Sequence, residues 1–167
     1  MMTESTILDA LVYLAEAGFE DEDLACVLDP AVVQRDAVVH RLGTAGFSPC
    51  IAEETWAWLH GLIVAASGWR AVAMDSSRRV YTSREERILD ADCRAFLEEL
   101  EALGILDAQH RELILDRALA LGQPDLALED LRWVVFYVLQ GAMNSVGPNA
   151  EDSWAGPPLI IESDYLH

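Results

Sequence analysis

The chain has 167 residues, 52% of them hydrophobic and 24% charged, enough for one compact domain or two small bundles that share a core. Its 29 acidic residues outnumber 11 basic residues, all of them arginine, and the net charge of -18 disfavours nonspecific binding to nucleic-acid phosphates. No window approaches the run of about 20 apolar residues that crosses a bilayer, so we expect a cytoplasmic protein without membrane contact.

The first 66 residues carry three predicted helices. Each begins at a capping residue, alone or followed by proline, continues with apolar residues at helical spacing, and ends at glycine or a small residue. The predicted ranges are 6–18, 30–43 (or 30–46) and 49–66. In the third helix, Trp58, Leu59 and Leu62 mark the side that we expect to be buried.

A β-hairpin is predicted after the third helix, because two short, β-tolerant runs flank a turn-prone Asp-Ser-Ser sequence. The two runs are residues 69–74 and 78–81. Three helices followed by a hairpin is the order of a winged helix, so residues 1–82 are interpreted as a winged-helix-like subdomain. The expected recognition helix contains Glu53 and Glu54 and no arginine, which favours contacts with protein over contacts with nucleic acid.

Residues 83–140 are predicted to form a three-helix subdomain on the same core. Its first helix, 83–103, has Thr82 or Ser83 as its cap and Glu85 in position for a capping box. The second helix runs from 107 to 122, and the third opens at 123–125. Residues 133–139 are apolar on all sides, which leaves a central helix or a buried strand open, although acids at the entry favour the helix.

Together these elements predict a mostly α-helical fold with one short β-hairpin. The expected core takes large apolar residues from both halves of the chain. They are Leu11, Leu14, Trp58, Leu62, Leu89, Phe96, Leu100, Leu113, Val134, Val135 and Val138.

From Gly141 onward the composition changes to glycine, proline, asparagine and serine, so residues 141–167 are treated as a tail that follows the packed domain. Apolar side chains recur in this tail, and we expect them to dock, either on their own domain or on a second copy in a homodimer. They are Trp154, Leu159, Ile160 and Ile161.

No catalytic, cofactor or metal motif is present. The four histidines are scattered, and His60 beside the Trp58 stripe is expected to be a partly buried, hydrogen-bonded ring. Without lysine, the chain cannot form a P-loop or a Schiff base. Cys26, Cys50 and Cys93 have no paired spacing and are interpreted as buried free thiols. We therefore expect no enzyme activity, no cofactor and no metal.

Basic character is concentrated between residues 70 and 94. The candidate partner-binding residues in this region are Arg70, Arg78, Arg79, Arg84 and Arg87. Arg94 has an acid four residues before it and another four residues after it, which predicts an exposed ladder of ion pairs. Arg117 lies on an apolar helix flank, and we expect Glu129 or Asp130 to be its partner.

Several stretches resemble the signature blocks of the bacterial Smg family. They include Arg79-Val80-Tyr81-Thr82, residues 89–97 (LDADCRAFL), 117–121 (RALAL) and 128–134 (LEDLRWV). The resemblance covers most of the chain. It implies a small, soluble, helical protein whose biochemical role is unassigned, and it supplies no catalytic residues to carry over.

These observations predict a non-enzymatic protein-interaction or regulatory module with an unidentified protein partner. The alternative is a nucleic-acid-associated winged-helix protein that uses Arg70, Arg78 and Arg79 of the hairpin. An enzyme with a dispersed site becomes credible only if the fold gathers several polar groups in one apolar pocket.

Overall fold

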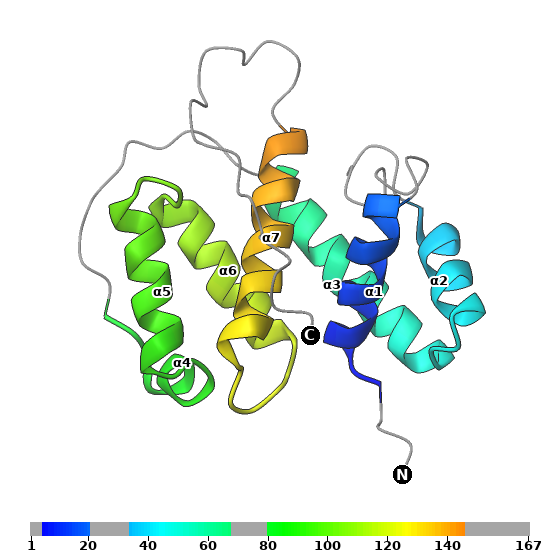
Figure 1. The fold of residues 1–167 in the computed structure, drawn as a ribbon, viewed down its shortest axis with the longest axis horizontal. Helices are drawn as coiled ribbons and strands as arrows, with labels where there is room; N and C mark the ends of the chain where they lie inside the picture. Colours follow the sequence, from blue (N-terminus) through cyan, green and yellow to red (C-terminus); the bar gives the residue numbers. More distant parts are fainter. Residues whose placement is uncertain (1–4, 21–33, 68–79, 146–167) are drawn as a thin grey trace.

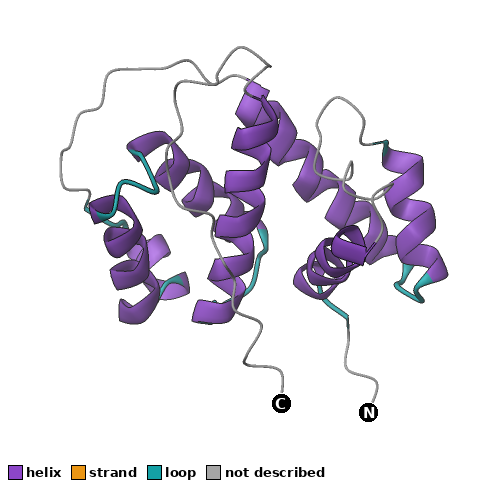
Figure 2. Cartoon of the chain, turned by 45° about the horizontal axis from the view of Figure 1, so that its top comes forward, coloured by secondary structure: helices purple, strands orange, loops and turns teal. Residues whose placement is uncertain are grey.

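The computed structural model describes residues 5–20, 34–67 and 80–145, and these ranges are mostly helical (Figure 1). The helices are α1 (Ile7–Glu20), α2 (Arg35–Thr44), α3 (Pro49–Ser67), α4 (Ser83–Ile88), α5 (Ala91–Ala102), α6 (Ala108–Ala120) and α7 (Leu128–Ser145). Figure 2 shows no strand in the described ranges, where the only β-type pairing is an isolated parallel bridge between Leu89 and Leu126. The predicted α-helical class is confirmed.

The predicted β-hairpin and winged helix are not supported. Val80 and Tyr81, at the end of the expected hairpin, form no strand. The rest of the hairpin falls in 68–79, outside the described residues. In the described part of the first half, the secondary structure consists of helices α1, α2 and α3.

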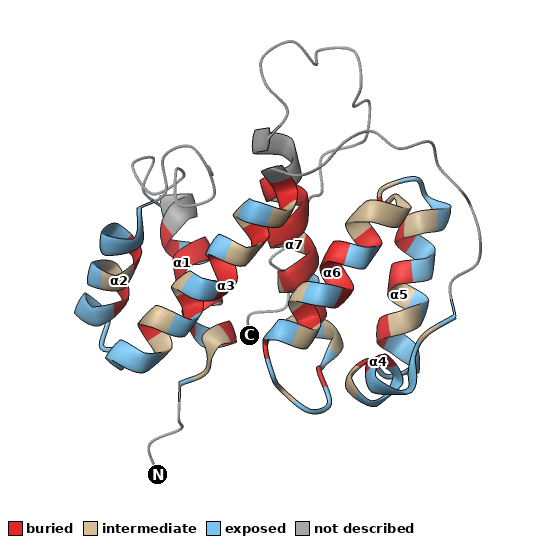
Figure 3. Ribbon diagram, turned by 180° about the vertical axis from the view of Figure 1, so that it is seen from behind, coloured by how far each residue is buried: buried red, intermediate tan, exposed pale blue. Residues whose placement is uncertain are grey.

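Helices α3 and α7 run through the middle of the molecule, with α1 and α2 on one side and α4, α5 and α6 on the other (Figure 1). Helix α3 contacts α1, α2, α6 and α7, while α7 contacts α1, α3, α5 and α6. One hydrophobic cluster contains residues from α1, α2, α3, α5, α6 and α7. Figure 3 shows buried residues, in red, concentrated along α7 and alternating with exposed ones on α3 and α6.

The predicted core is confirmed with one exception. Ten of the eleven expected core residues are buried, but Phe96 on α5 is only half-buried and packs against the cluster from its edge. Leu103, at the end of the helix predicted over 83–103, is 65% exposed. Phe96 and Leu103 are therefore apolar residues in or next to α5 that the core does not fully bury.

The helix predicted over residues 83–103 is two helices, so the second half of the described chain has four helices and not three. Helix α4 ends because Leu89 is extended, with φ -105° and ψ 112°. Asp90 then caps α5, its carboxylate accepting a 2.8 Å hydrogen bond from the backbone N–H of Cys93. The backbone N–H of Leu126 donates to the carbonyl of Ile88 at 2.9 Å. This hydrogen bond joins the segment between α4 and α5 to the loop before α7.

Two other predicted boundaries were wrong. Gln34 is extended, so α2 begins at Arg35 and no continuous helix runs through that position from residue 30. Helix α7 begins at Leu128 and not at 123–125, since Asp125 has a positive φ of 57° and Leu126 forms the bridge with Leu89. At its other end α7 continues past Gly141, which is buried.

Aromatic residues tie the central helices together. The Tyr137 hydroxyl on α7 donates a 2.6 Å hydrogen bond to the carbonyl of Leu11 on α1, and burial raises the pKa of this phenol. Trp58 on α3 meets the Tyr137 ring edge-on, with 5.8 Å between centroids. Its indole N–H donates to the carbonyl of Arg117 on α6 at 2.9 Å. Four helices are thus joined by hydrogen bonds and ring contacts inside an otherwise apolar core.

Candidate functional site

Local hydrogen bonds place the arginines of α4 on the surface. Thr82 and Glu85 form the predicted capping box: the Glu85 N–H donates to the Thr82 hydroxyl, and the Thr82 N–H donates to the Glu85 carboxylate at 2.7 Å. Glu85 is thereby buried on the inner side of α4. Arg84 and Arg87, three residues apart, are both exposed.

Within the described residues, neither Arg84 nor Arg87 forms an ion pair with a carboxylate. Arg87 donates one hydrogen bond from Nε to the Ser83 carbonyl at 3.1 Å. In a chain with 29 acidic residues, carboxylates are plentiful partners for a surface cation. We refer to Arg84 and Arg87 as the α4 arginine pair.

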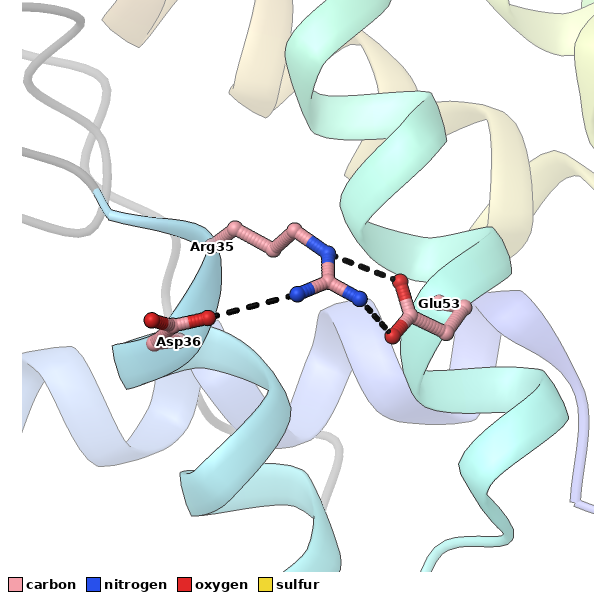
Figure 4. A network of polar contacts seen from close by, with 3 residues as sticks. All are labelled: Arg35, Asp36 and Glu53. Atoms are coloured by element: carbon pink, nitrogen blue, oxygen red, sulfur yellow. Dashed lines mark hydrogen bonds and ion pairs between the residues drawn. The ribbon is translucent and has the colours of Figure 1, made fainter.

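Other arginines of the bundle do form ion pairs. Figure 4 shows Arg35 of α2 bound through Nε and Nη2 to both carboxylate oxygens of Glu53 on α3, with Nη1 3.3 Å from Asp36. Arg111, which sequence reasoning did not single out, is buried and bonded to Glu101 at 2.7 Å. These pairs tie helices together and leave little capacity for a partner.

Arg117 is also structural, but the predicted pairing with Glu129 or Asp130 was wrong. Its guanidinium binds Asp116 on the same helix at 2.5 Å, and Nη1 donates to the carbonyl of Trp58 at 3.2 Å. Together with the indole bond, this makes a reciprocal link between α3 and α6.

The predicted ion-pair ladder of Arg94 was wrong as well. In the described ranges Arg94 pairs with neither Asp90 nor Glu98. Its guanidinium carbon lies 5.9 Å from the ring centroid of Tyr81, and Nη1 donates to the Leu89 carbonyl at 3.4 Å. Arg94 therefore supports the segment that leads into α4.

A comparable contact joins α5 and α7. The guanidinium carbon of Arg132 is 5.6 Å from the ring centroid of Phe96, and Arg132 is exposed. Sequence reasoning missed this pair, because the two residues lie 36 positions apart and no local pattern connects them.

The histidine and cysteine predictions were partly wrong. His60 is exposed, with its ring 5.7 Å from that of Trp56. Cys50 is exposed, whereas Cys93 is buried, and desolvation raises its pKa to about 12. Cys26 lies outside the described residues. Among the described side chains, no group of three or more His, Cys, Asp or Glu residues could hold a metal ion.

Several predicted site residues cannot be placed. Arg70, Arg78 and Arg79 lie outside the described residues, as do the four apolar residues of the tail. Of the five candidate partner-binding arginines, the structure thus brings together Arg84 and Arg87. In the ranges described, no helix is long and apolar enough to cross a membrane.

Comparisons with known proteins give a consistent result. A family described as "Protein of unknown function (DUF494)" matches residues 7–153. Relatives called "Protein Smg homolog" from Stenotrophomonas maltophilia are 40% identical over 98% of this chain and 99% of their own length. Relatives of the same name from Xanthomonas oryzae pv. oryzae and Xanthomonas campestris pv. campestris are 40% identical over 95% of this chain and 96% of theirs. No solved structure matches the chain.

Proposed function

The chain belongs to the Smg family, and from that premise we propose that it is a non-enzymatic protein-interaction or regulatory module whose α4 arginine pair contacts a protein partner in the cytoplasm. The observation that carries the proposal is the exposure of Arg84 and Arg87, two cations without carboxylate partners among the described residues of a strongly acidic molecule. Arginine is enriched at interfaces because its planar guanidinium binds carboxylates through two parallel hydrogen bonds.

The helix that carries this pair is anchored at both ends. The capping box fixes the start of α4, and the bridge between Leu89 and Leu126 fixes the break after it. Because these restraints are already made in the free protein, a partner would not have to order this backbone on binding. The part of the partner that contacts the α4 arginine pair should be acidic, since carboxylates pair with guanidinium groups.

The nucleic-acid alternative has no comparable support. Helix α3, the expected recognition helix, carries no arginine, and its exposed residues include Glu54. Submicromolar binding of labelled DNA or RNA at physiological salt would nevertheless overturn the proposal in favour of this alternative.

The test is a quantitative pull-down from native lysate with a double variant, Arg84→Gln with Arg87→Gln. The matched control is Ala37→Glu with His40→Glu on α2, at the far side of the bundle from α4 (Figure 1). Both changes take the net charge from -18 to -20 (-18 - 2) with His counted as neutral. Comparing the two variants therefore separates the loss of the α4 arginine pair from the effect of a more negative net charge.

We expect the native chain and the control to capture the partner equally and the arginine variant to capture about fivefold less of it. A fivefold loss corresponds to a binding free energy that is weaker by roughly 1 kcal/mol. Circular dichroism should show the same helix content for all three proteins. Equal capture by all three, or an equal loss in both variants, contradicts a role for the α4 arginine pair.

A further inference from the structure

Helices α5 and α7 present a cation beside exposed apolar surface. Arg132 lies over the Phe96 ring, and in the described ranges it forms no ion pair, although Glu129 is only one turn away on the same helix. Leu103 follows Phe96 by two helical turns and is 65% exposed. We refer to Phe96, Leu103 and Arg132 as the α5–α7 seat.

The sequence after α7 has the complementary chemistry. Residues 146–167 contain four acids and no arginine, and the triplet Leu159-Ile160-Ile161 is followed at once by Glu162 and then by Asp164. An apolar triplet with a carboxylate at its end matches apolar side chains that lie beside a guanidinium.

Chain length permits this segment to reach the seat. Arg132 lies 13 residues before the end of α7 at Ser145, about 20 Å along the helix axis. The 14 residues from 146 to 159 span up to roughly 46 Å when extended. A return along α7 therefore needs less than half of the available reach.

We infer that the C-terminal segment docks in cis on the α5–α7 seat, with residues 159–161 on Phe96 and Leu103 and the Glu162 carboxylate paired with Arg132. The alternative occupant is the same segment of a second copy. Attachment within one chain gives a millimolar effective concentration, so the cis arrangement prevails in dilute solution. This inference does not depend on the proposed function, which uses a different helix.

Charge also directs the segment to this seat. Arg132 is the one basic residue of α7, and the molecule as a whole is strongly negative. A segment with four carboxylates is repelled by most of that surface and attracted at the few exposed guanidinium groups. Among the exposed arginines that the structure describes, Arg132 alone lies over an aromatic ring, and it belongs to α7, the helix that precedes the segment.

Amide hydrogen exchange of the full chain, read by mass spectrometry on peptides from 154–162 and from α5, tests the inference. Arg132→Glu should speed exchange in residues 159–162 by up to about fivefold, the effect of one ion pair worth roughly 1 kcal/mol. Glu162→Arg should do the same. The double variant with both changes should restore the native exchange, because it reverses the polarity of the pair.

Ala37→Glu with His40→Glu on α2 is the matched control, since it changes the net charge by the same -2 as Arg132→Glu, away from the seat, and should leave the exchange of both regions unchanged. Deleting residues 154–167 should expose Phe96 and speed exchange in α5. Unchanged α5 exchange after the deletion, or no rescue in the charge-swapped double variant, overturns the inference. Protection that grows with protein concentration would assign the seat to a second copy and overturn docking in cis.

Discussion

At the residue scale, Gly61 is a position where the neighbouring Arg117 side chain leaves no room for a Cβ. It lies inside α3, where glycine normally weakens a helix by about 1 kcal/mol relative to alanine. A Cβ at this position would overlap Nη1 of Arg117, the atom that donates to the carbonyl of Trp58. The absence of a side chain thus leaves room for the guanidinium that links α6 to α3.

Gly61→Ala should therefore have opposite effects in two backgrounds. With Arg117→Ala, the new methyl group has free space, and the variant should be about 1 kcal/mol more stable through helix propensity alone. In the native background the guanidinium must move and lose its bond to Trp58, which should cancel or reverse that gain. Urea unfolding of the four proteins measures the coupling, which we expect to be ~1–2 kcal/mol. A coupling near zero would show that Arg117 does not occupy this space.

At the scale of the element, the start of α5 depends on one carboxylate. Asp90 accepts the backbone N–H of Cys93, and this hydrogen bond holds the pKa of Asp90 below its ordinary value of 3.8. A lowered pKa means that the folded state favours the ionised form. The cap therefore stabilises the protein above pH 3.8, and that contribution is lost as the pH falls through the lower pKa of the folded state.

Asp90→Asn tests this cap, because asparagine keeps the hydrogen-bond acceptor and removes the charge. At pH 7 the native protein should be more stable than the variant. The difference should shrink below pH 3.8 and vanish once Asp90 is protonated in the folded protein as well. Thermal unfolding of both proteins between pH 7 and pH 2 measures it. A stability difference that stays constant with pH would contradict the ionised cap.

At the scale of the whole molecule, the net charge of -18 opposes folding, since a compact state holds like charges closer together than an unfolded chain does. The described ion pairs relieve this repulsion only locally, as Arg35 and Arg111 each bind nearby carboxylates. The long-range part of the repulsion is sensitive to ionic strength, because the Debye length falls from ~30 Å at 0.01 M salt to ~8 Å at 0.15 M.

Raising NaCl from 0.01 to 0.15 M should therefore increase the melting temperature, on the order of 2–4 °C for each kcal/mol of repulsion removed in a protein of this size. Differential scanning calorimetry provides the measurement. Choline chloride at the same ionic strength is the control and should give the same shift. No shift, or a lower melting temperature, would show that attractive ion pairs outweigh the general repulsion.

For the candidate site, the positions of the arginines could be predicted from the sequence, but their ion pairs could not. The sequence places Arg84 and Arg87 in a basic region around a capping box, and the structure describes both as exposed on α4. It does not say which arginines are already paired, because pairing is decided by carboxylates from other helices, as with Arg111 and Glu101. The contact between Arg132 and Phe96 is equally invisible in a linear pattern.

The sequence by itself determined the helical class and two helix starts with a local cap, Asp107 for α6 and Thr82 for α4. Such hydrogen bonds form between near neighbours, so local order suffices to specify them. Only the tertiary structure decided where the predicted helix after Thr82 divides. That break depends on the contact between Leu89 and Leu126, residues 37 positions apart (126 - 89), and a continuous apolar stripe on one helix carries no information about a partner so distant in the chain.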